Sequence, residues 1–355
     1  MIDLLVAGGG PAGLATALHA ARAGMSVTVL EPRPAPTDKA CGEGLMPGAV
    51  AALDDLGVDS SAGWPLRGIC WLGVDAQATA DFRDGPGRGV RRTDLHVSLR
   101  AAVDAAGIDV LARPATDIRQ DAASVSASGL TARWLAAADG LHSPIRRGLG
   151  LDVGTSRRAY GRHAARYGQR AHFPVAPWTD HVEVHWSRDS EAYVTPVGSC
   201  LVGVAILSTR RASYQEHLTA FPRVLERIGG AAPTTSVRGA GPLRQSARAR
   251  VAGRVLLVGD AAGYVDALTG EGIALACAEA AALVGCLVDD RPDAYEQRWR
   301  AATRSYRVIT NGLLWTRERR LLAPLIVPAA SRLPRVFDAA VHQLAAGRSA
   351  AMHDT

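Results

Sequence analysis

The sequence has almost no lysine, because Lys39 is the only one among 40 lysine and arginine residues. We attribute this pattern to codon bias, since function rarely selects arginine so completely. The chain also has no run of about 18 uncharged apolar residues, which predicts that it has no membrane span. Met1 leads directly into an apolar strand, which predicts that there is no signal peptide.

Cysteine is scarce as well, with five residues that are odd in number and show no metal-ligand spacing. This usage predicts a reduced, cytoplasmic protein without a metal site. The hydrophobic content of 48% is typical of a globular chain, and 355 residues suffice for one large core or two joined cores.

The net charge of +6 arises from one stretch, residues 296–335, which holds nine arginines and two glutamates. Aromatic residues are not interleaved there at base-stacking spacing, so we expect no nucleic-acid partner. The stretch predicts a solvated helical face. The alternative is contact with an anionic partner, either a carrier protein or a membrane surface.

Three separated signatures of glycine and acid are present, and the first is the run Gly8-Gly9-Gly10-Pro11-Ala12-Gly13 after an apolar strand. Gly8 permits a tight turn, Gly10 permits close approach to a pyrophosphate, and Gly13 permits close packing of the next helix on the strand. This helix begins near Pro11 and Ala12 with free amide groups that favour phosphate. Glu31 follows the next strand, where an acid accepts hydrogen bonds from a ribose.

The second signature is Asp139-Gly140, which follows a predicted buried strand. The third is Gly259-Asp260 after another apolar strand, followed by Gly270, Gly272 and Ile273 at the start of an alanine-rich helix. A carboxylate at a strand end can accept hydrogen bonds from sugar hydroxyls, and the glycines let backbone amides reach phosphate. The three signatures in this order predict FAD rather than NAD as the bound nucleotide.

Between the second and third signatures the pattern changes to alternation with period two, as in residues 181–186, which is typical of antiparallel sheet with one wet face. A single helix is expected over residues 212–228. The predicted fold class is α/β, and the discontinuous Rossmann-like FAD-binding domain is interleaved with an antiparallel-sheet substrate domain and followed by C-terminal helices. The expected boundaries are 1–65, 92–155 and 250–290 for the FAD-binding domain, 66–91 and 156–249 for the substrate domain, and 291–355 for a helical cap.

With its second and third signatures the chain resembles the para-hydroxybenzoate hydroxylase fold superfamily of flavoproteins. Asp139-Gly140, with Ser143 and Arg146, is similar to the central Asp-Gly motif of that family. The resemblance implies that Asp139 supports the cofactor, that Asp260 binds the ribityl and pyrophosphate region, and that Arg92 contacts the flavin. It also implies an NAD(P)H co-substrate, which must dock transiently because the sequence has no second dinucleotide fingerprint.

Two branches of this superfamily compete. Residues 39–45 and 263–273 look like geranylgeranyl reductases and a related group of antibiotic-pathway monooxygenases. Ala267 departs from both branches. Residues 193–196 lack the fuller aromatic motif of the lipid reductases, which favours oxygenation.

The sequence therefore favours a monooxygenase that uses NAD(P)H and O2. It would hydroxylate or epoxidise an aromatic or polyketide-like substrate through a flavin C4a-hydroperoxide, in a site closed to water. We expect His185, Trp186 and Tyr193 of the sheet domain to form the substrate wall.

The alternative is a reductase of isoprenoid or other alkene double bonds, in which an acid supplies a proton. Cys41 is then the candidate proton donor, with a small core residue as the alternative, and Glu43 is either a pocket acid or a surface turn residue. Four histidines are candidates for deprotonating a phenol: His163, His172, His181 and His185. On an alternating strand His181 and His185 share one face with Glu183, which is either a polar pocket wall or the solvent side.

Overall fold

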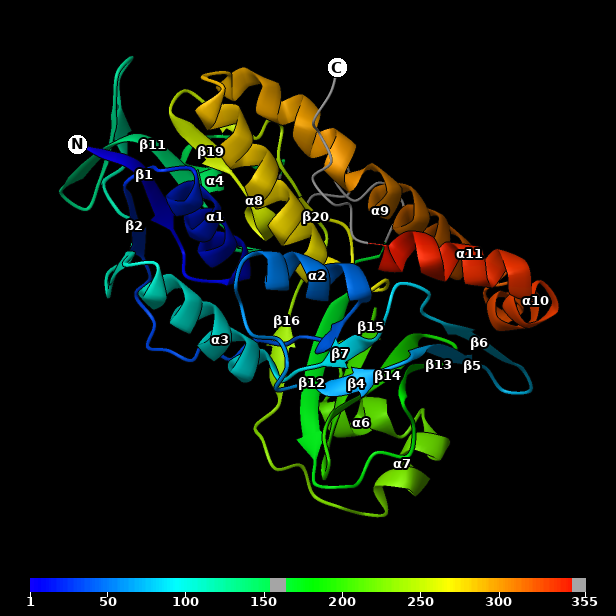
Figure 1. Cartoon of the computed structure of the whole chain (residues 1–355). Coiled ribbons are helices and arrows are strands. Elements are labelled where there is room, and N and C mark those ends of the chain that lie inside the picture. Colours follow the sequence, from blue (N-terminus) through cyan, green and yellow to red (C-terminus); the bar gives the residue numbers. More distant parts are fainter. Residues whose placement is uncertain (154–163, 347–355) are drawn as a thin grey trace.

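The computed structural model describes residues 1–153 and 164–346 and contains two large sheets (Figure 1). The first sheet is mostly parallel, because its central strand β1 pairs in parallel with both β11 and β2, and β19 pairs in parallel with β11. Its strands are, in spatial order, β18 (Val251–Ala252), β19 (Val255–Leu257), β11 (Leu130–Ala137), β1 (Ile2–Ala7), β2 (Val27–Leu30) and β8 (Asp109–Leu111). The predicted α/β class with a Rossmann-like layer is confirmed.

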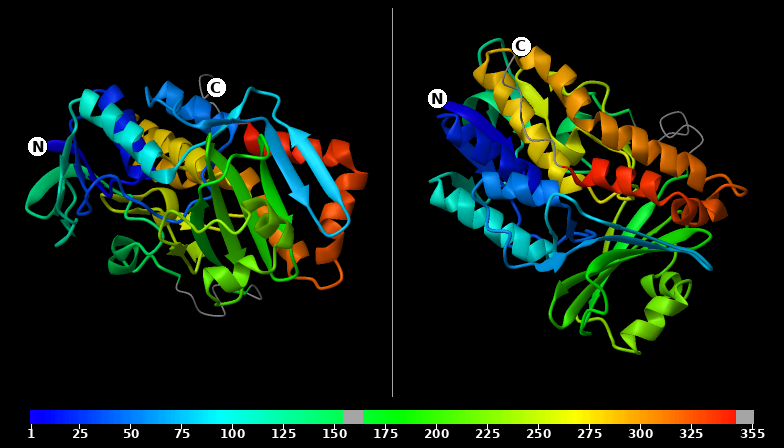
Figure 2. Two further views of the ribbon diagram at one scale, coloured as in Figure 1. Left: turned by 90° about the horizontal axis from the view of Figure 1, so that it is seen from below. Right: turned by 45° about the vertical axis from the view of Figure 1, so that its right-hand side comes forward.

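Helices cover this sheet, and α1 (Pro11–Arg22) lies between α8 (Gly272–Val288) and α3 (Arg92–Ala105) (Figures 1 and 2). The buried side chains of α1 are mostly Ala and Leu, which allows the helices to approach closely. The remaining elements of this part are α2 (Pro47–Asp55), α4 (Pro144–Gly148), and the hairpin of β9 (Arg119–Gln120) and β10 (Val125–Ala127).

The second sheet has seven strands, which pair antiparallel except for the parallel pair of β13 and β5. In spatial order they are β16 (Arg238–Ala240), β12 (Tyr167–Phe173), β15 (Leu201–Ser208), β14 (Ser190–Gly198), β13 (His181–Trp186), β5 (Gly68–Leu72) and β6 (Gln77–Asp81). Short strands join the two large sheets: β3 (Gly44–Leu45) and β4 (Trp64–Leu66) pair with β7 (Gly87–Gly89), and β17 (Gln245–Ser246) pairs with β20 (Gly263–Tyr264).

Two helices cover the outer face of the seven-stranded sheet, α6 (Tyr214–Leu218) and α7 (Pro222–Ile228) (Figure 1). The single helix expected over 212–228 is wrong. Pro222 begins α7, and because proline lacks an N–H group it cannot continue the backbone hydrogen bonds of α6.

The C-terminal part is helical, with α9 (Tyr295–Arg317), α10 (Ile326–Arg332) and α11 (Pro334–Ala345) (Figure 2). Both α10 and α11 pack on β6, so they cover the inner face of the seven-stranded sheet at its edge. The predicted boundary between residues 155 and 156, and the final residues 347–355 of the predicted cap, lie outside the described residues.

The end of α9 is fixed by a buried ionic cluster. Glu191 of β14 is fully buried and accepts hydrogen bonds from Arg166 (2.7 Å) and Arg317. Arg166 also lies 2.9 Å from Asp266, which precedes α8. Although burial alone would raise the pKa of Glu191, the two arginines lower it, so this carboxylate stays ionised. The arginine-rich stretch is therefore only in part a solvated face.

Replacement of Arg317 by alanine leaves the buried Glu191 with one cation instead of two. We expect the free energy of unfolding to fall by about 3 kcal/mol, because an incompletely paired buried charge is costly. Arg300→Ala is the matched control on the same helix: Arg300 is largely exposed and pairs with Glu296, so its loss should cost less than about 1 kcal/mol. Urea unfolding followed by circular dichroism measures both values, and equal losses would contradict the structural role of Arg317.

Candidate active site

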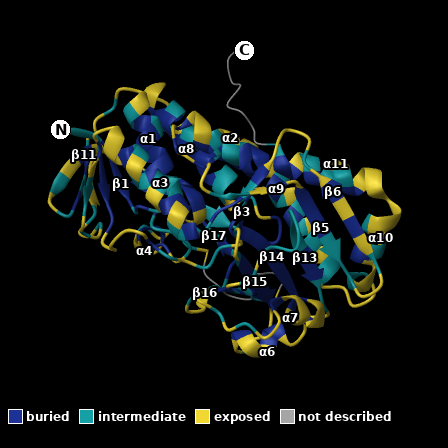
Figure 3. Cartoon of the chain, turned by 60° about the horizontal axis from the view of Figure 1, so that its bottom comes forward, coloured by how far each residue is buried: buried dark blue, intermediate teal, exposed yellow. Residues whose placement is uncertain are grey.

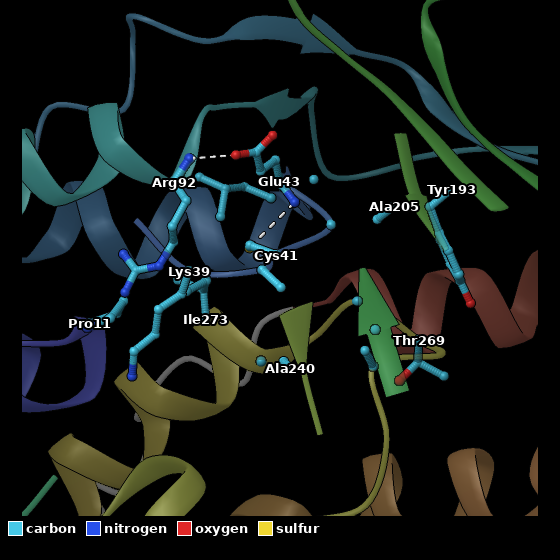
Figure 4. Close-up of a pocket in the computed structure, with 18 of the residues that line it drawn as sticks. Pro11, Lys39, Cys41, Glu43, Arg92, Tyr193, Ala205, Ala240, Thr269 and Ile273 are labelled. Carbon is cyan, nitrogen blue, oxygen red and sulfur yellow. Dashed lines mark hydrogen bonds between the residues drawn. The ribbon is translucent and has the colours of Figure 1, made fainter. Parts of the chain in front are cut away.

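A long pocket lies between the two large sheets (Figure 4). On the side of the parallel sheet it is lined by the glycine loop at residues 10–12 and by Gly259 and Asp260. On the side of the seven-stranded sheet and the helical cap it is lined by apolar side chains, which include Ile69, Trp71, Phe82, Val184, Leu207, Val341 and Leu344. The pocket can therefore hold a polar ligand group at one side and an apolar ligand chain at the other.

The glycines of the first signature have separate tasks. Gly8 has φ +113°, and a Cβ atom there would overlap the carbonyl of Ala138, the residue that follows β11. A Cβ atom on Gly13 would overlap the carbonyl oxygen of Gly8, so Gly13 permits the contact of α1 with the turn. A Cβ atom on Gly10 would meet nothing within 4 Å, which leaves the space above this residue open to a ligand. Gly10 is thus not required for close packing of the protein, and it borders the pocket.

The third signature lies against the first. Gly259 has φ +64°, and its missing Cβ would be 2.6 Å from the Cβ atom of Ala12. Pro11, Ala12 and Asp260 line the pocket together at this point. Gly270, Gly272 and Ile273 line it from the start of α8.

Glu31 lies behind the pocket wall rather than on it. Its carboxylate accepts hydrogen bonds from the Gly9 amide (2.8 Å) and from Arg33 (2.7 Å), and Arg33 is the residue that lines the pocket. Burial alone would raise the pKa of Glu31, but these donors lower it. The acid therefore fixes the glycine loop and Arg33, and its contact with a ribose stays a prediction.

Asp139 is not among the lining residues either, although its neighbours Ala138 and Gly140 are. One carboxylate oxygen accepts the Ile145 amide at 3.0 Å and so orients α4. The other oxygen is buried and has no hydrogen-bond partner in the part of the chain that the structure describes, and burial raises the pKa of this group.

Two cations extend along the pocket toward the start of α1, Arg92 and Lys39 (Figure 4). The Arg92 side chain is buried, and its Nη1 atom has no hydrogen-bond partner in the described residues. A buried donor without a partner is costly, so its presence on a pocket wall indicates an acceptor on a ligand. The open space at Gly10, this orphaned donor and the paired glycine loops all fit FAD, whose diphosphate is anionic and whose flavin offers acceptors.

Lys39 is a pocket-lining cation that sequence reasoning did not single out. Its signal was present, because the one lysine in a chain that otherwise uses only arginine lies in the pocket.

Cys41 and Glu43 both line the pocket on the segment that connects its two sides. The Glu43 amide donates to the Cys41 sulfur (3.4 Å), and the Thr195 hydroxyl of β14 donates to the Gly42 carbonyl (2.8 Å). Burial raises the pKa of the Cys41 thiol, and the Glu43 charge raises it further, so the thiol is protonated at neutral pH. The segment therefore presents a neutral proton donor to the pocket.

The Glu43 side chain is held on both sides. Its backbone has φ +61°, a conformation that non-glycine residues seldom adopt. One carboxylate oxygen accepts the Arg92 amide at 2.9 Å, and the other lies 2.6 Å from His172 Nε2. Arg170 Nη2 lies 3.5 Å from the first oxygen. Glu43 is thus neither a free pocket acid nor a surface residue, and it positions the Cys41 segment.

Arg170 and His172 come from alternate positions of β12, and both side chains are buried. Sequence reasoning did not connect either residue with Glu43. The only signal was the period-two spacing that places them on one face, because contacts across more than 100 residues are set by the fold.

The three predicted substrate residues do not lie together. Tyr193 lines the pocket and donates to the Leu268 carbonyl at 2.9 Å. Trp186 lies on the same face of the sheet and packs on Trp71, with ring centroids 5.1 Å apart, but does not line the pocket. His185 is on the opposite face, since its neighbours Val182 and Val184 are the residues of β13 that face the pocket.

The other histidines are accounted for by ordinary contacts. His185 pairs with Glu183 at 2.8 Å, and His181 pairs with Asp180 and Asp81. The face shared by His181, Glu183 and His185 is therefore not a pocket wall. His163 lies outside the described residues.

No group of three or more potential metal ligands occurs in residues 1–153 and 164–346. Over the same residues, no helix is both long and apolar enough to cross a membrane.

Comparison with known families decides the class. A family model described as FAD binding domain matches residues 1–290. The chain belongs to this family of flavoproteins. The resemblance to the para-hydroxybenzoate hydroxylase fold is confirmed, and the protein is an FAD-dependent oxidoreductase.

Curated relatives of this flavoprotein include proteins named as reductases and one named as a putative FAD-dependent monooxygenase. The menaquinone reductase of Mycobacterium tuberculosis is 31% identical over 304 residues, which cover 76% of this chain and 72% of the relative. Digeranylgeranylglycerophospholipid reductase 1 of Methanothermobacter thermautotrophicus is 31% identical over 306 residues, which cover 77% and 73%.

Solved structures agree on the fold of the flavoprotein. The flavin-dependent halogenase CmlS superposes with a TM-score of 0.80 at 20% identity over 100% of this chain and 74% of that one. The p-nitrophenol 4-monooxygenase PnpA of Pseudomonas putida gives 0.79 at 20% identity over 98% and 99%. At this identity the likeness shows the fold alone.

The glycine loop can be tested by two substitutions three residues apart. Gly10→Ala should leave the unfolding temperature of the FAD-free protein unchanged, because its Cβ meets no protein atom, and should lower FAD affinity about tenfold or more. Gly13→Ala should destabilise the FAD-free protein itself by about 1–3 kcal/mol, because its Cβ overlaps the turn. Thermal unfolding and flavin fluorescence titration measure the two effects, and a Gly10→Ala variant with normal FAD affinity would refute the assignment.

Two glutamates, the half-buried Glu271 before α8 and the buried Glu279 on α8, hold their protons at neutral pH. Burial raises the pKa of Glu271, which precedes α8, to about 8. Burial likewise raises the pKa of Glu279 to about 8, although this side chain also accepts the Gly259 amide at 2.7 Å. A raised pKa means that the folded state holds the proton more tightly than the unfolded chain does. The resulting stabilisation is complete below the ordinary value of 4.5 and is lost as the pH rises through about 8.

Glu279→Gln should therefore flatten the dependence of stability on pH. Glutamine still accepts the Gly259 amide but cannot ionise. Between pH 6 and pH 9 the unfolding temperature of the native flavoprotein should fall by about 2 °C or more beyond that of the variant. Glu226→Gln, an exposed acid on α7, is the control and should follow the native curve. Parallel curves for Glu279→Gln and the native protein would show that Glu279 does not titrate in this range.

Proposed function

We propose that this flavoprotein reduces a carbon–carbon double bond in a long, apolar, isoprenoid-like substrate. The observation that carries this proposal is the Cys41 thiol, which is protonated and lines the pocket between its FAD side and its apolar side. A reductase of alkenes needs a proton donor at this junction, and Cys41 is suitably placed.

FAD supplies hydride chemistry when it is bound and reduced. The residues that would hold it are the glycine loop at 8–13, Arg92, Lys39, and Gly259-Asp260 with the start of α8. Arg92 offers its Nη1 atom, which has no hydrogen-bond partner within residues 1–153 and 164–346, and the amides at the start of α1 offer donors to the diphosphate. A nicotinamide nucleotide is proposed as the source of reducing equivalents, docking transiently as the sequence predicts.

The chain's own contribution is a proton at Cys41 Sγ. In such a reduction the π bond of the alkene and the S–H bond of Cys41 would break, one carbon would receive a hydride equivalent and the other the thiol proton, and two C–H bonds would form. The thiolate that remains regains a proton from solvent before the next turnover. Glu43, held by Arg92 and His172, keeps the sulfur at its position through the backbone amide.

The apolar wall supports a lipid-like substrate. Side chains of β5, β13, β15 and α11 line the pocket with few polar atoms, as in Ile69, Val184, Leu207 and Val341. Two relatives at 31% identity are named as reductases of menaquinone and of digeranylgeranylglycerophospholipid, the putative monooxygenase is 28% identical, and the solved halogenase and monooxygenase share only the fold.

A monooxygenase that acts on an aromatic or polyketide-like substrate is the second candidate. It is favoured by residues 193–196, which lack the fuller aromatic motif of the lipid reductases. Tyr193 supplies one aromatic ring to the pocket wall, and the hydroxyl of Thr195 is engaged by the Gly42 carbonyl. Oxygenation would need no thiol, so Cys41 separates the two candidates.

Single-turnover experiments distinguish them. The flavoprotein is reduced chemically under nitrogen and mixed with a menaquinone or a digeranylgeranylglycerophospholipid in detergent, and the product is weighed by mass spectrometry. Reduction of a carbon–carbon double bond adds the mass of two hydrogen atoms without O2, and for menaquinone this gain must persist after the quinol ring has been reoxidised in air. Incorporation of labelled oxygen, with no anaerobic product from either lipid, would overturn the reductase in favour of the monooxygenase.

Cys41→Ser should slow anaerobic reoxidation of the flavin by the reducible lipid about 100-fold or more, because the proton donor is lost. The visible spectrum of bound FAD should stay intact, since the one hydrogen bond of the Cys41 sulfur to the described residues is from the Glu43 amide. Cys200→Ser, at an exposed cysteine outside the pocket, is the control and should react at the native rate. If Cys41→Ser is reoxidised at the native rate, Cys41 is not the proton donor.

A further inference from the structure

Exposed apolar side chains gather at one corner of the protein, which we call the α9–α11 tip and define as residues 315–336. It comprises the end of α9, the short 3-10 helix Ala323–Leu325, α10 and the start of α11. Five of the thirteen large apolar side chains that are exposed in the described residues lie there: Trp315 (49%), Leu321 (87%), Leu325 (52%), Leu333 (56%) and Val336 (63%). Figure 3 shows the exposure of α10 at this corner. Apolar side chains scattered singly are ordinary on a surface, but such a concentration marks an interaction site.

Arginines are interleaved with these apolar side chains. Arg319, Arg320, Arg332 and Arg335 are exposed, and Glu318 is the only acid within residues 315–336. The Arg319 guanidinium stacks over the Trp315 ring, 3.3 Å from its centroid, so charge and aromatic surface are presented together. Interfacial anchors combine basic and apolar side chains in this way, because the apolar groups enter the acyl boundary while the cations meet anionic headgroups.

The tip is continuous with the apolar side of the pocket. Val336 is exposed, while the next residue, Phe337, is buried and packs on Trp71 with ring centroids 4.8 Å apart. Trp71 lines the pocket, as do Val341 and Leu344 farther along α11. One helix therefore contributes to both the exposed tip and the pocket wall.

The base of the tip is rigid. Arg317, at the end of α9, is held by the buried Glu191 and also donates to the carbonyl of Ser187 at 2.9 Å. The exposed side chains beyond it are thus presented from a fixed support, which reduces the ordering that a partner would have to impose.

We propose that the α9–α11 tip is a docking surface for an anionic lipid bilayer. The excess of arginine fits anionic headgroups, and the protruding leucines fit the apolar boundary beneath them. That the bilayer also delivers the substrate rests on the proposed function, whereas the docking itself does not. A second copy of this chain carries the same four arginines, so their mutual repulsion disfavours a symmetric contact through this surface.

Vesicle sedimentation tests the proposal with the FAD-loaded protein. We expect it to sediment with vesicles of phosphatidylcholine and phosphatidylglycerol, to bind at least tenfold more weakly to phosphatidylcholine alone, and to be released from the anionic vesicles by high salt. Absence of binding to the anionic vesicles would overturn the proposal.

Leu321→Asp should weaken binding to the anionic vesicles at least tenfold without affecting folding, because this side chain is 87% exposed. Val97→Asp places the same charge at an exposed position of α3 (54%) outside the tip, and should bind as the native protein does. Equal binding of Leu321→Asp and the native protein would place the contact elsewhere. A native dimer in sedimentation velocity that Leu321→Asp converts to monomer would instead assign the tip to a second copy.

Activity on a detergent-solubilised lipid separates this proposal from the proposed function. Leu321→Asp should retain native single-turnover rates in detergent and lose them when the same lipid is embedded in anionic vesicles. Native rates of the variant on embedded lipid would contradict docking while leaving the reductase in place. Failure of every lipid in detergent, with vesicle binding intact, would overturn the reductase and leave the docking surface.

Discussion

The contact on which the site depends is the one between the Glu43 carboxylate and its partners from both halves of the chain. The Arg92 amide belongs to the start of α3 beside the parallel sheet, while Arg170 and His172 belong to β12 of the other sheet. Because one buried carboxylate satisfies groups on both sides, the two sheets meet in a single arrangement. To make these contacts Glu43 adopts a left-handed backbone conformation, which is strained for a non-glycine residue. Such strained residues are typical of functional sites. The hydrogen bonds of the Glu43 carboxylate also fix the position of the neighbouring Cys41.

Because side chains alternate along each strand, the seven-stranded sheet has one face toward the pocket and one face toward a hydrophobic core. On β14, Glu191, Tyr193 and Thr195 face inward, toward the cap and the pocket, while Ala192 and Val194 pack beneath α6 and α7. The inward side carries the ionic cluster, the apolar wall and the hydrogen bond to Gly42. The outer side is a hydrophobic core. Substitutions on the outer face therefore change packing, whereas substitutions on the inner face change the ionic cluster or the pocket.

The cofactor half could be predicted from the sequence because its motifs are local. Gly8, Gly10 and Gly13 lie within one turn and the helix that follows it. Their spacing alone predicts the positions at which a Cβ atom would interfere. The substrate half could not, because its contacts join residues far apart. Alternation predicted that His181, Glu183 and His185 share a face but not which face meets the pocket, since that choice depends on the packing of α6 and α7. Proline at position 222 was a visible signal for the break between these helices that the apolar pattern concealed. The deep placement of Arg317 was hidden in a run of arginines whose other members are mostly exposed.

The parallel sheet also constrains how the chain matures during synthesis. Leu135 of β11 pairs with Val255 of β19, and the whole seven-stranded sheet apart from β5 and β6 is encoded between them. The nascent chain therefore cannot close its nucleotide layer until the other sheet has left the ribosome. Such non-local pairing folds slowly, and the apolar edge of β11 stays uncovered in the meantime. The pocket that fits FAD needs Gly259 and Asp260 beside the glycine loop, so it is completed only in a nearly finished polypeptide.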